Sequence, residues 1–225
     1  MKKKITLLLL AGFWGLSAAA QECTTTWPYL YDDFKEGTIF VEGLKPKTAL
    51  LNIYIKDGHL HFIDKEIVRE ANAAQVGEVV LGEDHYYNVS GCLMKVVASS
   101  ENGLVLERRL GDFSALLETG GAYGVASNTS ATRKLSSIET HSHINQSHML
   151  LLQGKHDGQP VELESKLFLK PTGKSAVEAS ARAVEHSLSA QGKAAWKPWK
   201  KANKVKWSQP ESLLQVLAFL TTENY

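Results

Sequence analysis

Pairs of turn-forming residues divide residues 37–114 into short runs that favour β-structure. Asp57-Gly58 follows the run 49–55, in which apolar and polar residues alternate, and Asn102-Gly103 precedes the run 104–110. Asp-Gly and Asn-Gly pairs between apolar runs favour the tight turns of β-hairpins, because their residues tolerate positive φ. This part of the chain is therefore predicted to form an antiparallel sheet.

Other β-favouring runs extend the predicted sheet beyond these two hairpins. A third hairpin is predicted at Asp157-Gly158, and residues 65–74 are interpreted as the end of a strand followed by a turn. The remaining predicted strands are residues 38–41, 60–63, 76–81, 86–89, 93–98, 149–152, 161–163 and 167–169.

The last part of the chain is predicted to be helical. Residues 175–188 are rich in alanine, and Ser208, Pro210 and Glu211 form the pattern of a capped helix start. Four apolar residues then recur at the spacing of one helix face, namely Leu213, Val216, Leu217 and Leu220. The predicted fold is α+β, with an antiparallel β-sheet or partial β-barrel followed by C-terminal helices.

The chain is expected to have three regions. Residues 1–20 are predicted to be a signal peptide, residues 21–170 a β-rich domain, and residues 171–225 a helical C-terminal segment packed on that domain. Residues 119–147 are rich in Gly, Ser, Thr and Asn and contain few large apolar residues, which predicts a mobile loop.

The N-terminus has the three parts of a cleavable export signal. Three lysines at positions 2–4 precede the apolar stretch 5–16 and a run of alanines that ends at Ala20, after which cleavage is predicted. The apolar stretch is shorter than the about 20 residues that cross a bilayer, and no later segment comes close. We expect a soluble mature protein without a transmembrane helix, located in the periplasm or outside the cell.

The chain has two cysteines, Cys23 and Cys92. In an oxidising compartment they are predicted to form a disulfide, which would stabilise the fold by roughly 4 kcal/mol through restriction of the unfolded chain. Two unpaired thiols are the alternative. Lipidation of Cys23 is disfavoured, because Gln21 and Glu22 separate it from the small residues that lipoprotein signals place directly before the cysteine.

The charge balance argues against a general binder of polyanions. The chain has 25 Lys and Arg residues and 24 Asp and Glu residues, and loss of residues 1–20 would remove three lysines and no acid, which leaves a net charge of −2. Nucleic acid is therefore not an expected partner.

A histidine cluster is the strongest hint of chemistry. Two histidines separated by one residue on a strand point to the same side, so His141 and His143 with His148 would suit a zinc or copper site, and His59 and His61 repeat the pattern. The alternative is a set of solvent-facing histidines. The sequence assigns no catalytic residues, because its serines lack a nucleophile-elbow pattern.

Basic and aromatic residues interleave near the C-terminus. Lys197, Lys200 and Lys201 with Trp196 and Trp199 are predicted to contact an anionic surface such as lipid headgroups. The alternative is that the two tryptophans anchor a helix to the core while the lysines face solvent.

Several segments resemble small uncharacterised secreted proteins of Gram-negative bacteria. The resemblance is carried by Trp27-Pro28-Tyr29-Leu30 with Phe34, by 37–39 and 49–52, and by the closing stretch from Trp199 to Leu214. It implies a β-rich exported domain with a helical tail and carries no catalytic residues across.

The function expected from these observations is that of an exported, non-enzymatic binding or cell-envelope-associated protein. An envelope protein, a glycan or an anionic lipid are the partners left open. The alternatives are a metal-dependent hydrolase that uses the His141, His143 and His148 cluster, with zinc as its cofactor, and a binder of anionic membrane surfaces.

Overall fold

The computed structural model describes residues 24–113 and 146–222. The predicted signal peptide and residues 119–145 of the predicted loop lie outside these ranges. The strands are β1 (Thr24–Thr25), β2 (Lys35–Val41), β3 (Lys47–Ile53), β4 (Leu60–Asp64), β5 (Ile67–Glu70), β6 (Val76–Leu81), β7 (Asp84–Val89), β8 (Cys92–Ser100), β9 (Gly103–Asp112), β10 (Gln146–Ser147), β11 (Val161–Pro171) and β12 (Val177–Glu178). The helices are α3 (His148–Gln153), α4 (Ala181–Ser187), α5 (Ala190–Ala202) and α6 (Pro210–Thr222).

All the strands of the described residues belong to one antiparallel sheet. Its order is β1-β11-β9-β8-β7-β6-β2-β3-β4-β5-β10, and β12 pairs with β11. The path does not close on itself, and helices follow the last strand. The predicted α+β class is therefore confirmed.

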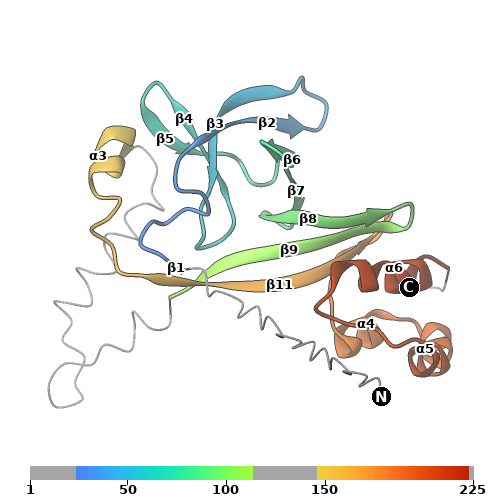
Figure 1. Ribbon diagram of the computed structural model, residues 1–225. Coiled ribbons are helices and arrows are strands. Elements are labelled where there is room, and N and C mark those ends of the chain that lie inside the picture. The colour runs from blue at the N-terminus through green and yellow to red at the C-terminus, as the bar shows by residue number, and fades with distance from the viewer. Residues whose placement is uncertain (1–23, 114–145, 223–225) are drawn as a thin grey trace, which may run out of the picture.

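The sheet curls because the β3–β4 connection reaches across to β8 and β9. The Leu93 N–H donates to the Gly58 carbonyl at 2.9 Å, and the Gly111 N–H donates to the Ile55 carbonyl at 2.8 Å. As a result, β2 to β5 lie over β8, β9 and β11 (Figure 1). Buried apolar side chains from several strands form a core cluster here, among them Ile39, Leu51, Ile53, Leu60, Val79 and Leu81.

Two predicted hairpins are confirmed, with small shifts in the turn. The Asp57-Gly58 connection between β3 and β4 spans six residues, 54–59. Within it the Gly58 N–H donates to the Tyr54 carbonyl. In the β8–β9 hairpin, Ser100 pairs with Gly103, so the two turn residues are Glu101 and Asn102.

One prediction around β5 is confirmed and one around β11 needs correction. Residues 65–74 contain a strand followed by a turn, since β5 spans 67–70 and the Gln75 N–H then donates to the Asn72 carbonyl at 2.9 Å. Lys65 and Glu66 have φ of 50° and 64° and form the loop between β4 and β5. Such paired positive φ values are typical of a two-residue hairpin. The runs 161–163 and 167–169 are parts of the single strand β11, which pairs without interruption with β9.

The predicted strand 149–152 is wrong, because these residues form α3. Leu151 is buried while Met149 and Leu150 are 58% and 60% exposed. A short apolar run does not distinguish a strand from a short helix by its periodicity. The third predicted hairpin at Asp157-Gly158 is therefore also wrong, since the element directly before this turn is the helix α3 and not a strand paired with β11.

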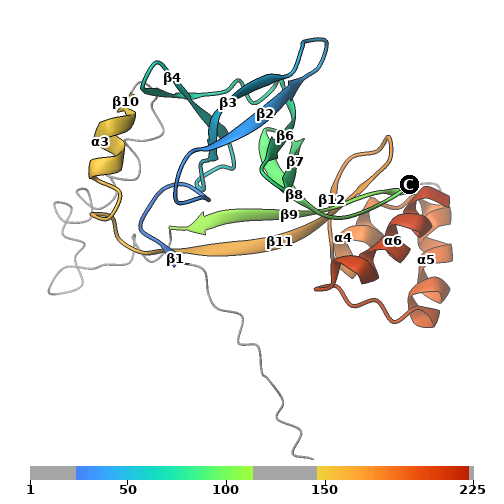
Figure 2. The same cartoon turned by 45° about the horizontal axis from the view of Figure 1, so that its top comes forward.

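The C-terminal helices pack against one end of β8, β9 and β11 (Figure 2). Only 181–187 of the predicted helix 175–188 are helical, and residues 177–178 form β12. Helix α6 begins at Pro210, so Gln209 takes the cap position predicted for Ser208. The predicted apolar face is confirmed, because Leu213, Val216, Leu217 and Leu220 are fully buried. Burial of these four contributes roughly 6–12 kcal/mol before the entropy cost, which explains why α6 docks.

In the part of the chain that the structure describes, no helix is long and apolar enough to cross a membrane.

Candidate functional site

The predicted metal cluster is only partly within the described residues. His141 and His143 lie outside them. His148 is the first residue of α3, and its ring packs edge-on against Phe34 with centroids 5.4 Å apart. Among residues 24–113 and 146–222, no group of three or more His, Cys, Asp or Glu side chains is arranged to hold a metal ion. The described residues therefore do not fit a zinc centre.

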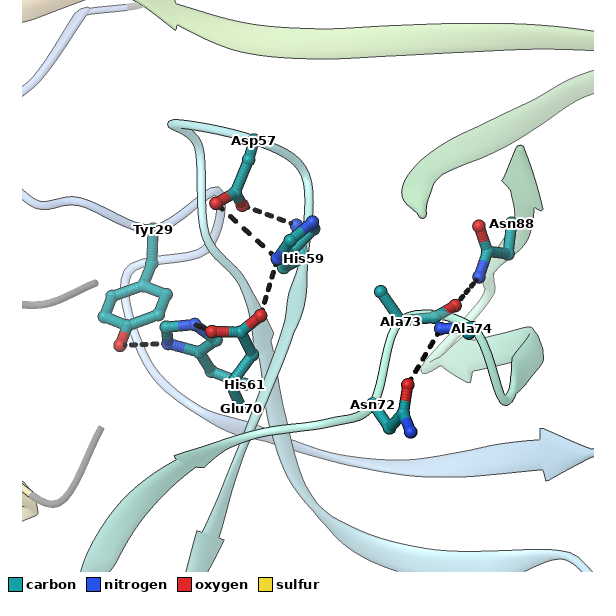
Figure 3. A network of polar contacts seen from close by, with 9 residues as sticks. All are labelled: Tyr29, Asp57, His59, His61, Glu70, Asn72, Ala73, Ala74 and Asn88. Atoms are coloured by element: carbon teal, nitrogen blue, oxygen red, sulfur yellow. Dashed lines mark hydrogen bonds and ion pairs between the residues drawn. The ribbon is translucent and has the colours of Figure 1, made fainter. Parts of the chain in front are cut away.

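The second histidine pair lies at the start of β4, and its two members differ in environment. His61 is 1% exposed, its Nδ1 lies 2.8 Å from the Tyr29 hydroxyl, and its ring stacks on Tyr54 at a centroid distance of 5.0 Å. Burial raises the pKa of Tyr29, so this hydroxyl stays protonated; the tautomer of His61 decides which of the two groups donates. His61 is thus part of the core (Figure 3).

His59 is held by two carboxylates and is 29% exposed. Its Nδ1 lies 2.6 Å from Glu70 Oε1 and 3.6 Å from Asp57 Oδ2, and Asp57 Oδ1 accepts the His59 backbone N–H at 2.9 Å. Because Nδ1 faces carboxylate oxygens, the neutral form of the ring carries its proton on that nitrogen. Burial raises the pKa of Asp57, although the bond from the His59 backbone N–H opposes this shift.

Glu70 links the two histidines. It lies opposite His61 in the β4–β5 pairing, and its second oxygen is 3.9 Å from His61 Nε2. The polar network therefore runs from the buried Tyr29 through Glu70 to the partly exposed His59 (Figure 3).

His59 borders an open pocket of about 580 Å³, here called the His59 pocket. A methyl group built on Gly91 would lie 3.8 Å from His59 Nε2, so this nitrogen faces the turn that forms one wall. The pocket is lined by His59, Ala73, Ala74, Val76, Gly77, Tyr87, Asn88, Ser90 and Gly91.

The predicted tryptophan and lysine residues separate onto two sides of α5. Trp196 is fully buried and stacks on Trp199 with centroids 5.1 Å apart, and both rings contact Phe219 of α6. Trp199 is half-buried, whereas Lys197, Lys200 and Lys201 are exposed. The structure therefore places both tryptophans in the helical core and leaves the lysines in solvent.

An open cleft of about 900 Å³ lies between α4 and α5. Arg182, His186, Lys193 and Lys200 line it together with Glu178 and Glu185. The Lys200 ammonium is 3.7 Å from a Glu185 carboxylate oxygen, and both side chains are more than a third exposed. This pair contributes little to stability, so Lys200 can exchange Glu185 for another anion.

Cys92 is a free thiol in the described part of the chain. Burial raises its pKa to about 11, which disfavours thiolate chemistry. Cys23 lies outside the described residues, so the disulfide stays a prediction.

Sequence reasoning identified His59 but missed the residues that orient it. The relevant signal was the strand β5, but its pairing with β4, which places Glu70 opposite His61, was not predicted. It also missed a second network, in which Asp84 accepts a hydrogen bond from the Tyr31 hydroxyl at 2.6 Å and pairs with Lys95 at 2.5 Å. Burial raises the pKa of Asp84, but these two bonds outweigh that effect and lower it below its ordinary value.

No family model, curated protein or solved structure matches this chain. The resemblance to secreted proteins of Gram-negative bacteria consequently stays a prediction, and any function must be argued from the residues themselves.

Proposed function

We propose that this protein is exported and, without catalysing a reaction, associates with an anionic lipid surface of the cell envelope through the lysines of α5. Export is supported by the basic, apolar and small-residue segments of residues 1–20. Surface association is supported by the charge distribution around α5.

The observation that carries the proposal is the absence of acidic residues from a long C-terminal stretch. Between Glu185 and Glu211 the sequence has six lysines and no Asp or Glu. The whole chain has 25 basic and 24 acidic residues, so the chain outside this stretch has 19 basic and 24 acidic residues. The molecule therefore has one strongly basic region on an otherwise acidic chain, which would orient it toward a negative surface.

The lysines of α5 lie together on one side of the helix. Lys193, Lys197, Lys200 and Lys201 follow one another at spacings of four, three and one residue, which places them within an arc of about 100°. The buried Trp196 lies just outside this arc and packs on Phe219 of α6, so the orientation of the lysine face is set by packing.

The expected affinity is modest and electrostatic. Each lysine close to an anionic bilayer contributes about 1 kcal/mol, so the four lysines of this face would supply about 4 kcal/mol, and salt would screen it over about 10 Å. Because Trp196 and Trp199 pack inward, insertion of an aromatic side chain into the lipid is not part of the proposal.

The test is co-sedimentation with phosphatidylglycerol-containing vesicles at low and high salt, with phosphatidylcholine vesicles as the neutral reference. Binding is expected only to the anionic vesicles and only at low salt. Lys200→Glu with Lys201→Glu should weaken it at least about 30-fold, because reversal of two charges costs about 2 kcal/mol or more.

A matched control reverses two exposed lysines, one in the β2–β3 turn and one at the start of β3, Lys45→Glu with Lys47→Glu, and should bind as the wild type does. Equal loss in both double variants would show that net charge alone is responsible and would refute a specific role of α5. Binding that survives the α5 reversal, or no binding to anionic vesicles, would refute the proposal outright.

Export has a separate measurement. Intact mass of protein recovered from the periplasmic fraction should correspond to cleavage after Ala20. Recovery of the uncleaved chain from the cytoplasm alone would contradict this part of the proposal.

A further inference from the structure

We propose that the His59 pocket binds a neutral polyhydroxylated ligand, such as one sugar unit of a glycan. This site is separate from the lysine face of α5, and the inference does not depend on the proposed membrane association. It rests on how the pocket walls are held, on the orientation of His59 and on the local charge.

The walls of the pocket are tied together by one side chain. The Asn88 amide nitrogen donates to the carbonyls of Ala73 and Val76 at 2.6 Å each, and its oxygen accepts the Gly91 N–H at 2.8 Å. These bonds connect the segment before β6 and the first residue of β6 to the turn between β7 and β8; Figure 3 shows the bond from Asn88 to Ala73. The pocket is thus preorganised, which lowers the entropy cost of binding a small ligand.

His59 presents one ring nitrogen to the pocket as a hydrogen-bond acceptor. Its Nδ1 proton is engaged by Glu70, which leaves the lone pair on Nε2, the atom near Gly91. A ligand hydroxyl is the donor that suits such an acceptor. The exposed Ser90 hydroxyl lines the same pocket and can both donate and accept.

The charge around His59 disfavours an anionic ligand. Asp57 and Glu70 both lie within 4 Å of His59 Nδ1, and the residues that line the pocket include no Lys or Arg. The other lining residues are mostly small, with Tyr87 as the one aromatic side chain. Small side chains in the walls leave backbone groups accessible to ligand hydroxyls, while an aromatic side chain offers apolar surface for the C–H groups of a sugar.

The volume agrees with a small ligand. About 580 Å³ is within the range of small-molecule sites, which run from roughly 300 to 1,000 Å³.

The experiment is a glycan array that carries both neutral and sialylated or sulfated glycans, followed by titration of the best neutral glycan in solution. The wild type should bind neutral glycans in preference to anionic ones. His59→Ala should weaken binding about tenfold through loss of the ring acceptor. His85→Ala, which removes an exposed histidine of β7 outside the pocket lining, is the matched control and should bind normally.

Two further readouts separate loss of the site from loss of the fold. His59→Ala should keep its thermal unfolding transition and its behaviour toward phosphatidylglycerol vesicles, and the α5 double reversal should keep glycan binding. If the alanine variant does not fold, His59→Lys restores a donor to Glu70 and has no acceptor, and it should show the same loss.

Three results would overturn the proposal. They are the absence of binding to any neutral glycan, a preference for anionic glycans, and equal binding by the wild type and a folded His59 variant.

Discussion

Replacement of Gly103 by alanine should strongly destabilise the end of the sheet on which the C-terminal helices pack. Gly103 begins β9 with φ of 138° and pairs with Pro171 of β11. An alanine Cβ would lie 2.9 Å from Pro171 Cα, 3.1 Å from the Lys170 carbonyl carbon and closer still to its oxygen. These are backbone atoms, so no side-chain rotation relieves the overlap.

The magnitude follows from two costs. A non-glycine residue at this φ costs about 1–3 kcal/mol, and the steric overlap adds about 1–3 kcal/mol. The expected loss in the free energy of unfolding is therefore about 4 kcal/mol, which corresponds to roughly 8–16 °C in Tm for a chain of this size. The neighbouring turn is also affected, because the Asn102 carbonyl accepts bonds from the Thr172 N–H and the Thr221 hydroxyl.

Gly173→Ala is the matched control, since Gly173 has φ of 72° but no atom within 4 Å of its Cβ position. Its free energy of unfolding should fall by only about 1 kcal/mol, which is the cost of a left-handed conformation for alanine. Urea unfolding followed by circular dichroism measures both variants. Equal destabilisation of the two would refute the steric argument at Gly103.

Three further predictions concern buried groups. In a Cys23→Ser background, iodoacetamide should alkylate Cys92 of the folded protein about 100-fold more slowly at pH 8 than Cys92 of the unfolded chain. The reason is that burial raises the pKa of the thiol from 9.0 to about 11. Equal rates would contradict its burial. The folded-state pKa of Asp84 is lowered, so the stability gap between the wild type and Asp84→Asn should be full above about pH 4 and shrink as pH falls further; a gap constant from pH 7 to pH 3 in urea unfolding would disprove this linkage. Trp196→Ala should cost about 3–5 kcal/mol in the same assay, because the ring is fully buried, and a loss below about 1 kcal/mol would show that α5 does not depend on it.

The parts of the fold that sequence reasoning predicted are those in which neighbouring residues decide the structure. The glycine of a turn and the apolar face of α6 act over a few residues, and both the Asp57-Gly58 connection and the burial of Leu217 are confirmed. A short window contains the relevant information in these cases, because backbone strain and helical periodicity are local properties.

The candidate site was only partly predictable, because it depends on contacts between distant segments as well as on local sequence. The spacing of His59 and His61 is visible in the sequence, but their different roles depend on Glu70 in another strand and on Tyr29 before β2. Both histidines have the same local pattern, and only tertiary contacts bury one ring and leave the other at a pocket.

The sequence by itself determined the hairpin turns, the apolar stripe of α6 and the excess of lysines near the C-terminus. Only the tertiary structure decided that residues 149–152 form a helix, that Trp196 turns inward while Lys200 faces solvent, and that Asn88 ties the His59 pocket together. The physical reason is that burial and hydrogen bonding between distant segments select among local conformations of similar energy.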